Sequence, residues 1–132
     1  MRKTYEIQLN GIRIGTTEFE SADPPMGVVS GKITFENIKS GYSFFKDYCL
    51  KNKVIISTDY PEDKFIDTQV IPELKVLTEN KTELKGFGVF ITGFDAEEFE
   101  ITVGGIDSEF YKIEFSKHYN EYFNPKWKVK KK

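Results

Sequence analysis

The dipeptide Asn10-Gly11, set between two short runs of alternating apolar and polar residues, is the sequence feature that most restricts the fold. Both residues tolerate the positive φ of a type I′ turn, which joins antiparallel strands through two residues. With this turn Leu9 lies opposite Ile12. The next pair on the same face is Ile7 and Ile14, so the four side chains form one apolar face of a half-buried hairpin. The chain is therefore expected to build antiparallel sheet.

Further strands are predicted by the same alternation. Residues 29–35 form one strand, and the prolines of the preceding segment 21–27 separate it from the first hairpin by a connection instead of a tight turn. The later pattern predicts a central strand at 54–56, a polar loop over 58–66, strands over 74–78, 84–94, 99–103 and 111–115, and turns at 79–81 and 95–97.

One amphipathic helix is predicted over residues 40–51. Ser40 is suited to the N-cap, and Tyr42, Phe45 and Cys49 follow on one face at helical spacing. Asn52 is suited to the C-terminal cap. A shorter helical turn is predicted to begin at Ser116.

These elements predict an α+β protein with a curled, mostly antiparallel sheet of about seven or eight strands and one main helix. Partial closure into a barrel is an open alternative. The 132 residues include 12 Phe and 7 Tyr, which is enough apolar surface for one ordinary core. We expect a single domain over residues 1–127, followed by a basic tail over residues 128–132.

Charge is divided unevenly along the chain. Residues 112–132 contain seven lysines and two glutamates, so they carry +5, and the remaining residues carry −7 of the total of −2. An acidic body repels phosphate backbones, so no nucleic-acid partner is expected. No apolar run approaches the length of a membrane span and no signal peptide is visible, so no membrane partner is expected either. A single cysteine fits the reducing cytoplasm.

Few residues suggest catalysis, and no metal or cofactor motif is present. His118 and Cys49 are the one thiol–imidazole pair available, but Cys49 falls on the apolar helix face, where thiols are usually inert. Two groups of acidic residues leave open a divalent-cation site, an acid–base pair or a solvated surface. They are Asp59, Glu62, Asp63 and Asp67 in one region, and Asp95, Glu97, Glu98 and Glu100 in the other.

The segment Asp23-Pro24-Pro25-Met26 is the candidate partner-binding site. Two consecutive prolines fix φ, favour extended geometry and leave little conformational entropy to lose on binding. Met26 would supply an adaptable apolar contact, and Gly27 permits a bend. The alternative is that the prolines stiffen a connection while Met26 plugs one end of the core.

The same segment carries a family resemblance. Asn10-Gly11, Ile14-Gly15, Glu18-Phe19-Glu20 and Asp23–Val28, followed by Gly31, resemble a family of small uncharacterised bacterial proteins with an N-terminal hairpin and a similar acidic–Pro–Met–Gly segment. The match covers about residues 5–35. The resemblance implies a bacterial, intracellular origin and no mechanism.

The leading functional prediction is a non-catalytic cytoplasmic binding module whose partner is a protein, either a second copy or another chain. An antitoxin-like or immunity-type protein would suit this description. Two alternatives remain open. One is a small-ligand container lined by aromatic rings, namely Phe87, Phe90, Phe94, Phe99 and Phe115. The other is a hydrolase that uses carboxylates from two loops.

Overall fold

The computed structural model describes residues 3–95 and 98–124, and in these residues ten strands form two antiparallel sheets. The four-stranded sheet has the order β5-β2-β1-β8, with β1 (Tyr5–Leu9), β2 (Ile12–Thr17), β5 (Thr34–Phe35) and β8 (Leu74–Leu77). The six-stranded sheet has the order β3-β4-β10-β9-β7-β6, with β3 (Ser21–Asp23), β4 (Val28–Lys32), β6 (Ile56–Tyr60), β7 (Phe65–Thr68), β9 (Gly88–Phe94) and β10 (Glu98–Gly104). The predicted α+β class is confirmed, without closure into a barrel.

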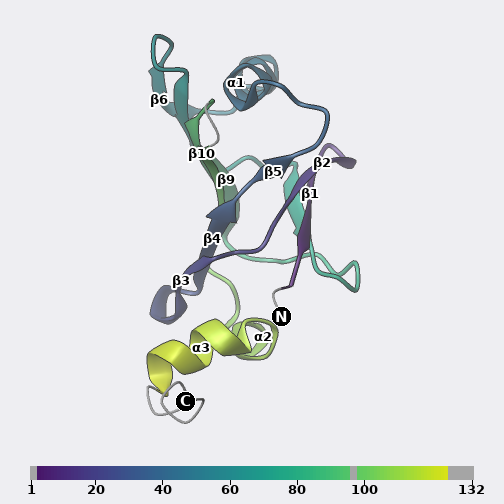
Figure 1. Cartoon of the computed structure of the whole chain (residues 1–132), viewed down its shortest axis with the longest axis vertical. Helices are drawn as coiled ribbons and strands as arrows, with labels where there is room; N and C mark the ends of the chain where they lie inside the picture. The colour runs from purple at the N-terminus through teal and green to yellow at the C-terminus, as the bar shows by residue number, and fades with distance from the viewer. Residues whose placement is uncertain (1–2, 96–97, 125–132) are drawn as a thin grey trace.

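The three helices of the described residues lie at the two ends of this pair of sheets (Figure 1). Helix α1 (Gly41–Asn52) lies at one end, and α2 (Ser108–Glu114) and α3 (Ser116–Phe123) lie at the other, beside the N-terminus. A short 3-10 turn, η1 (Pro24–Met26), joins β3 to β4. No helix among the described residues is long and apolar enough to cross a membrane.

The N-terminal hairpin is confirmed, with one error in its register. Asn10 and Gly11 have φ values of 53° and 77°, as a type I′ turn requires, and Leu9 pairs with Ile12. A register shift between Ile7 and Gln8 then pairs Ile7 with Gly15 instead of Ile14. The bulge turns Ile14 into the core, whereas Ile12 remains 68% exposed.

The predicted strand over residues 29–35 is divided between the two sheets. Strand β4 belongs to the six-stranded sheet and β5 to the four-stranded sheet, and the chain passes from one to the other at Ile33. The preceding connection, from β2 to β3, crosses in the opposite direction through Phe19. Phe19 is 1% exposed and has a φ of 50°, a rare conformation for a bulky residue.

Gly31 allows these two crossings to lie against one another. A Cβ at this position would be 2.3 Å from Thr17 Oγ1, 2.6 Å from Phe19 N and 2.7 Å from Phe19 Cα. Since two of these atoms belong to the backbone, they cannot move aside as a flexible side chain would. Only glycine leaves enough space at position 31 for this close approach of the two backbone segments. The close approach brings the two sheets together at this point.

Helix α1 forms as predicted. The Ser40 hydroxyl accepts a hydrogen bond from Ser43 N at 3.1 Å, and Tyr42, Phe45 and Cys49 are buried. The helix ends one residue later than expected, because Lys53 takes the left-handed conformation at its C-terminus. The Asn52 side chain instead donates to the Tyr48 carbonyl at 2.8 Å.

The prediction for residues 54–66 is wrong. Ile55 is exposed, and β6 begins at Ile56 as an edge strand, not a central one. The supposed polar loop over 58–66 is the β6–β7 hairpin, in which Lys64 has a φ of 51° at the turn. The acidic residues of this segment led to the loop prediction. An edge strand, however, tolerates polar and charged side chains, so their presence does not exclude a strand.

The predicted hairpin between residues 74–78 and 84–94 is correct only beside its turn. Lys81 takes a positive φ, and Leu77 pairs with Glu83 in an isolated bridge. Leu84 N also donates to Val76 O at 2.8 Å. The chain then leaves for the other sheet, where β9 begins at Gly88 and pairs with β10. Part of the predicted turn at 95–97 lies outside the described residues.

The predicted strand over residues 111–115 is a helix, α2. Its alternating pattern was misleading because Tyr111 and Phe115 are also four residues apart, which places both on one helix face. Both are buried, while Ile113 is 76% exposed. The Asp107 side chain accepts from Phe110 N at 3.1 Å and so caps the helix. The predicted helical turn at Ser116 is α3.

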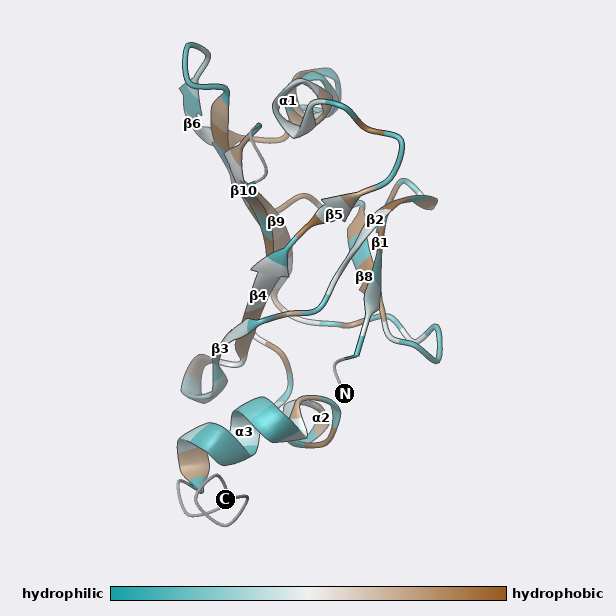
Figure 2. Cartoon of the chain, viewed as in Figure 1, coloured by the Kyte–Doolittle hydropathy of each residue, from teal (hydrophilic) through white to brown (hydrophobic). Residues whose placement is uncertain are grey.

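Two groups of aromatic rings fill the core near its ends. Near α1, Phe45 is stacked on Phe99 with ring centroids 6.1 Å apart, and Phe35 packs against both rings. Near α2 and α3, Tyr5, Phe19 and Phe115 form a triangle with centroids 5.0–5.9 Å apart. Figure 2 shows that most of α3 is hydrophilic, with hydrophobic residues at its C-terminal end.

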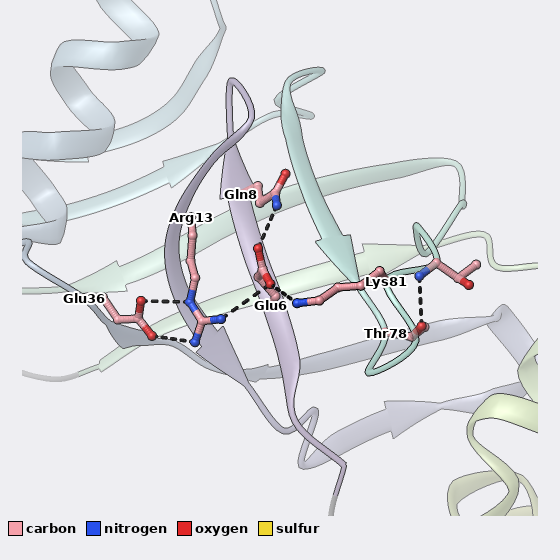
Figure 3. A network of polar contacts seen from close by, with 7 residues as sticks. Glu6, Gln8, Arg13, Glu36, Thr78 and Lys81 are labelled. Atoms are coloured by element: carbon pink, nitrogen blue, oxygen red, sulfur yellow. Dashed lines mark hydrogen bonds and ion pairs between the residues drawn. The ribbon is translucent and has the colours of Figure 1, made fainter.

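The outer face of the four-stranded sheet carries a network of charged side chains (Figure 3). Arg13 donates two hydrogen bonds to Glu36, at 2.9 and 2.8 Å, and reaches Glu6 at 3.4 Å. Glu6 also accepts from Lys81 at 2.8 Å and from Gln8 at 2.7 Å. The hydrogen bond from Lys81 lowers the pKa of Glu6, and the one from Arg13 lowers the pKa of Glu36.

Replacing Gly31 by alanine should lower the free energy of unfolding by about 1–3 kcal/mol, because the crossing at Phe19 must shift to admit the methyl group. Urea denaturation measures the loss. Gly104→Ala is the matched control, since a Cβ there would meet only Val28 Cγ2, at 3.9 Å. Equal losses in the two variants would show that the close approach at Gly31 is unimportant.

The Arg13–Glu36 pair should stabilise the fold in a pH-dependent manner. Because the folded state lowers the pKa of Glu36 below its ordinary 4.5, the stabilisation is present above pH 4.5 and is lost as the pH falls through the lower folded value. Glu36→Gln should therefore lower the thermal midpoint at neutral pH, and the difference from the wild type should vanish once the pH is below the lowered pKa of Glu36. A difference that is constant with pH would contradict the electrostatic origin.

Candidate functional site

The predicted partner-binding segment forms the tip of the β3–β4 hairpin. Asp23 ends β3, and Pro24, Pro25 and Met26 form η1, so the segment is a 3-10 turn and not the extended connection that was expected. Asp23, Pro25 and Met26 are exposed, with Met26 at 68%. The Met26 side chain therefore does not plug the core, and the alternative of a buried methionine is wrong.

Gly27 fixes this tip to the body of the protein. It takes a φ of 67° and donates its N–H to Pro24 O at 3.0 Å, while its carbonyl accepts from Ile106 N at 2.9 Å. A Cβ on Gly27 would be 2.7 Å from Ile106 O. The prolines, the left-handed glycine and the backbone contact together hold Met26 in a defined position.

Phe87 is a second exposed residue near this tip, because its backbone contacts Gly104, close to the Ile106 that contacts Gly27. Its ring is 93% exposed, although its backbone N–H donates to Gly104 O at 2.6 Å. Gly105 has a φ of 67°, and a Cβ there would lie 2.4 Å from Phe87 Cβ. Val70 is 45% exposed and contacts neighbouring Gly88. We call Met26, Val70 and Phe87 the apolar tip.

Sequence reasoning placed Phe87 incorrectly. The small-ligand alternative placed its ring in an interior together with four other phenylalanines, but the structure does not bring these rings together. Phe87 and Phe94 are exposed, at 93% and 45%, whereas Phe99 and Phe115 are buried in the aromatic groups at opposite ends of the core. The two glycines beside Phe87, Gly86 and Gly88, were the only signal of its exposed position.

One residue from each of the two acidic groups predicted from the sequence contacts the first residues of α1 or its N-cap. Asp95 accepts hydrogen bonds from the Ser40 hydroxyl and, at 2.7 Å, from Tyr42 N. Asp59 accepts one from the Tyr42 hydroxyl and forms an ion pair with Lys46 at 3.0 Å. The hydrogen bond from Tyr42 lowers the pKa of Asp59. These carboxylates hold α1 on the six-stranded sheet, a structural arrangement that differs from the paired acid and base of a hydrolase.

Cys49 and His118 do not form a dyad. Cys49 is buried in α1, while His118 lies in α3 at the opposite end of the molecule (Figure 1). His118 Nε2 is 2.7 Å from the Phe19 carbonyl, so this nitrogen carries the proton. In the part of the chain that the structure describes, no group of three or more His, Cys, Asp or Glu side chains is placed to hold a metal ion.

A cleft of about 490 Å³ lies between the start of β1, the Glu18–Glu20 segment and the junction of α2 with α3. At its base the Tyr5 hydroxyl donates to Glu114 Oε2 at 2.7 Å. Lys3 Nζ contacts the same carboxylate at 3.2 Å and the Glu114 carbonyl at 3.0 Å. Burial, followed by the hydrogen bond to Glu114, raises the pKa of Tyr5, so its hydroxyl keeps the proton that it donates.

No local pattern in the sequence indicates this cleft. Its residues come from three separate parts of the chain, 3–5, 18–20 and 114–121. The last of these parts includes the end of α2, which was predicted to be a strand. Comparisons with models of protein families, with curated proteins and with solved structures find no match to this chain. The apolar tip and the cleft are therefore interpreted from their own chemistry.

Cys49 should react slowly with thiol reagents in the folded protein. It is fully buried, and burial raises its pKa to about 11, so little thiolate forms at neutral pH. Labelling followed by absorbance should be slow in buffer and rapid and stoichiometric after unfolding in guanidinium chloride. Rapid labelling of the native protein would contradict the observed packing of α1.

Proposed function

We propose that this protein is a non-catalytic protein-binding module of the bacterial cytoplasm, and that the apolar tip is its contact surface. The observation that carries the proposal is the Phe87 ring, which is 93% exposed on a backbone held by the Gly104 carbonyl. Covering such a ring is favourable, at about 25 cal/mol per Å² of apolar surface removed from water. A rigid anchor also loses little conformational entropy on binding.

Met26 supports the same interpretation. Its unbranched, polarisable side chain adapts to different apolar partners, and here it is presented on a turn fixed by two prolines and Gly27. Phe87 and Met26 lie on either side of the 104–106 segment, since Gly104 accepts from Phe87 and Ile106 donates to Gly27. Aromatic residues and methionine are enriched at protein interfaces, and both kinds of side chain are exposed here.

The acidic body and the single cysteine agree with an antitoxin-like or immunity-type role in a reducing compartment, which forms part of this proposal. Such proteins act by covering a partner, and that task needs a contact surface and no catalytic group. A second copy of the chain is the other partner consistent with the apolar tip.

The double variant Met26→Ser/Phe87→Ser tests the proposal. Both side chains are exposed, so the free energy of unfolding should change by no more than about 0.5 kcal/mol. Light scattering detects self-association, and quantitative affinity capture from the host lysate detects other partners. At least one complex that the wild type forms, with itself or with another protein, should be lost or strongly weakened in the double variant.

Ile12→Ser is the matched control, because Ile12 and Met26 are both 68% exposed and Ile12 lies at the tip of a different hairpin. This variant should retain every complex of the wild type. If the double variant retains them as well, or if the wild type is monomeric and captures nothing, the proposed function is wrong.

A further inference from the structure

We infer that the protein forms a dimer in which β6 of one copy pairs antiparallel with β6 of a second copy, across a two-fold axis at Thr58. The pairing joins the six-stranded sheets of the two copies into one continuous sheet. This surface is separate from the apolar tip, and the inference does not rest on the proposed function.

Strand β6 is the most open sheet edge among the described residues. The edge strands β3, β5, β6 and β8 contain three, two, five and four residues, so β6 is the longest of them. The outer edge of β8 is partly covered, since Leu84 N donates to Val76 O and Leu77 bridges to Glu83. Strand β6 lies at the margin of its sheet, with β7 as its one strand neighbour in the described chain (Figure 1). Because alternate residues of an edge strand direct N–H and C=O groups away from that neighbour, β6 can pair with a further strand.

The irregular part of β6 is confined to its start. A register shift between Ile56 and Thr58 marks a bulge, and residues 58–60 then pair in sequence with residues 65–67 of β7. A bulge increases the local twist without changing the extended geometry of the residues that follow it. The proposed axis lies at the first residue of the regular part.

Apolar side chains flank this edge. Ile55 is 68% exposed and Tyr60 is 58% exposed. The Tyr60 ring is stacked on Phe65 with centroids 5.9 Å apart, and Phe65 packs against Phe94 at 4.9 Å. This aromatic row crosses β9, β7 and β6 and ends at the open edge. In a pairing centred on Thr58, Tyr60 comes next to the exposed Ile55 of the second copy, and the symmetry forms this apolar contact twice.

The charges before and after β6 are complementary across the same axis. The turn over residues 61–64 carries two exposed carboxylates, Glu62 and Asp63, and one lysine, whereas the segment 51–53 carries exposed Lys51 and Lys53 and no carboxylate. A two-fold axis at Thr58 brings together positions equally far before and after it, so Asp63 lies opposite Lys53 of the second copy. Each end of the paired strands thus joins an acidic turn to a basic segment, which favours a second copy as the occupant.

The side chains of β6 also select this axis over its neighbour at Asp59. With the axis at Thr58, Asp59 lies opposite Ser57 of the second copy. An axis at Asp59 would place two carboxylates directly opposite one another, which is unfavourable. It would also place Ser57 opposite Pro61, which has no N–H to donate to a strand ladder.

Oxidative cross-linking tests the pairing and its axis. Directly opposite residues of antiparallel strands have Cβ atoms about 4.5–5.5 Å apart, so Thr58→Cys should form a disulfide-linked dimer in oxidised glutathione, visible on a non-reducing gel. Cys49 is buried and does not compete. Thr92→Cys is the matched control, because Thr92 is half-buried like Thr58 but lies on β9, inside the sheet. Equal cross-linking of the two variants would overturn the inference.

A charge exchange tests the contact between the acidic turn and the basic segment. Sedimentation equilibrium should show a wild-type dimer, and Lys53→Glu or Asp63→Lys alone should raise its Kd by about tenfold or more, because like charges then face one another twice. The combined variant restores opposite charges and should return the Kd to within about threefold of the wild type. Lys75→Glu, at an exposed position on β8, is the control and should leave the Kd unchanged.

Three results would overturn the inference. A wild type that stays monomeric up to about 0.5 mM would leave the β6 edge to a strand of another protein. A combined variant whose losses simply add would exclude the Asp63–Lys53 contact. Loss of the dimer in Met26→Ser/Phe87→Ser would place self-association at the apolar tip, whereas the inference expects that variant to remain dimeric whatever its effect on other partners.

Discussion

The close approach of β4 to the chain at Phe19 is the contact on which the rest of the structure depends. At Gly31 the two backbones are so near that no side chain fits between them. The chain can therefore leave the four-stranded sheet after β2, enter the six-stranded sheet at β3 and return at Ile33. These crossings make one core out of two sheets, and they bury Phe19 against Tyr5 and Phe115.

The same crossing positions the acidic cleft. Because Phe19 is held in a left-handed conformation, its carbonyl reaches His118, and the flanking glutamates are exposed along one wall. Tyr5 and Lys3 bring the Glu114 end of α2 to the opposite side. The cleft is thus a consequence of how α2 and α3 close one end of the sheets, whereas the apolar tip is a consequence of two hairpin-like turns held by Gly27 and Gly105.

Acidic residues perform different tasks in different places. Asp95 satisfies a backbone N–H at the start of α1, where a helix lacks internal partners and where negative charge is favourable. Asp59 pairs with Lys46 across the junction of α1 and β6. Glu6 and Glu36 join strands through Arg13 on the outer face of the four-stranded sheet. The acidic residues of this chain therefore serve helix capping and the linking of neighbouring strands as well as solubility.

The sequence by itself determined the features that depend on neighbouring residues. Asn10-Gly11 specifies its turn through backbone conformation, and Ser40 with the spacing of Tyr42, Phe45 and Cys49 specifies α1. Antiparallel sheet in an α+β protein followed from the same local patterns. The two prolines and Met26 were also visible as a distinctive segment, although their 3-10 geometry was not.

Tertiary structure alone decided the features that depend on distant contacts. Residues 111–115 fit a strand and a helix equally well by pattern, and burial of Tyr111 and Phe115 on one face, with the cap at Asp107, selected the helix. The division of residues 29–35 between two sheets depended on space at Gly31. The exposure of Phe87 and the assembly of the cleft depended on segments far apart in the chain, and no local pattern records which side of a distant strand a residue will meet.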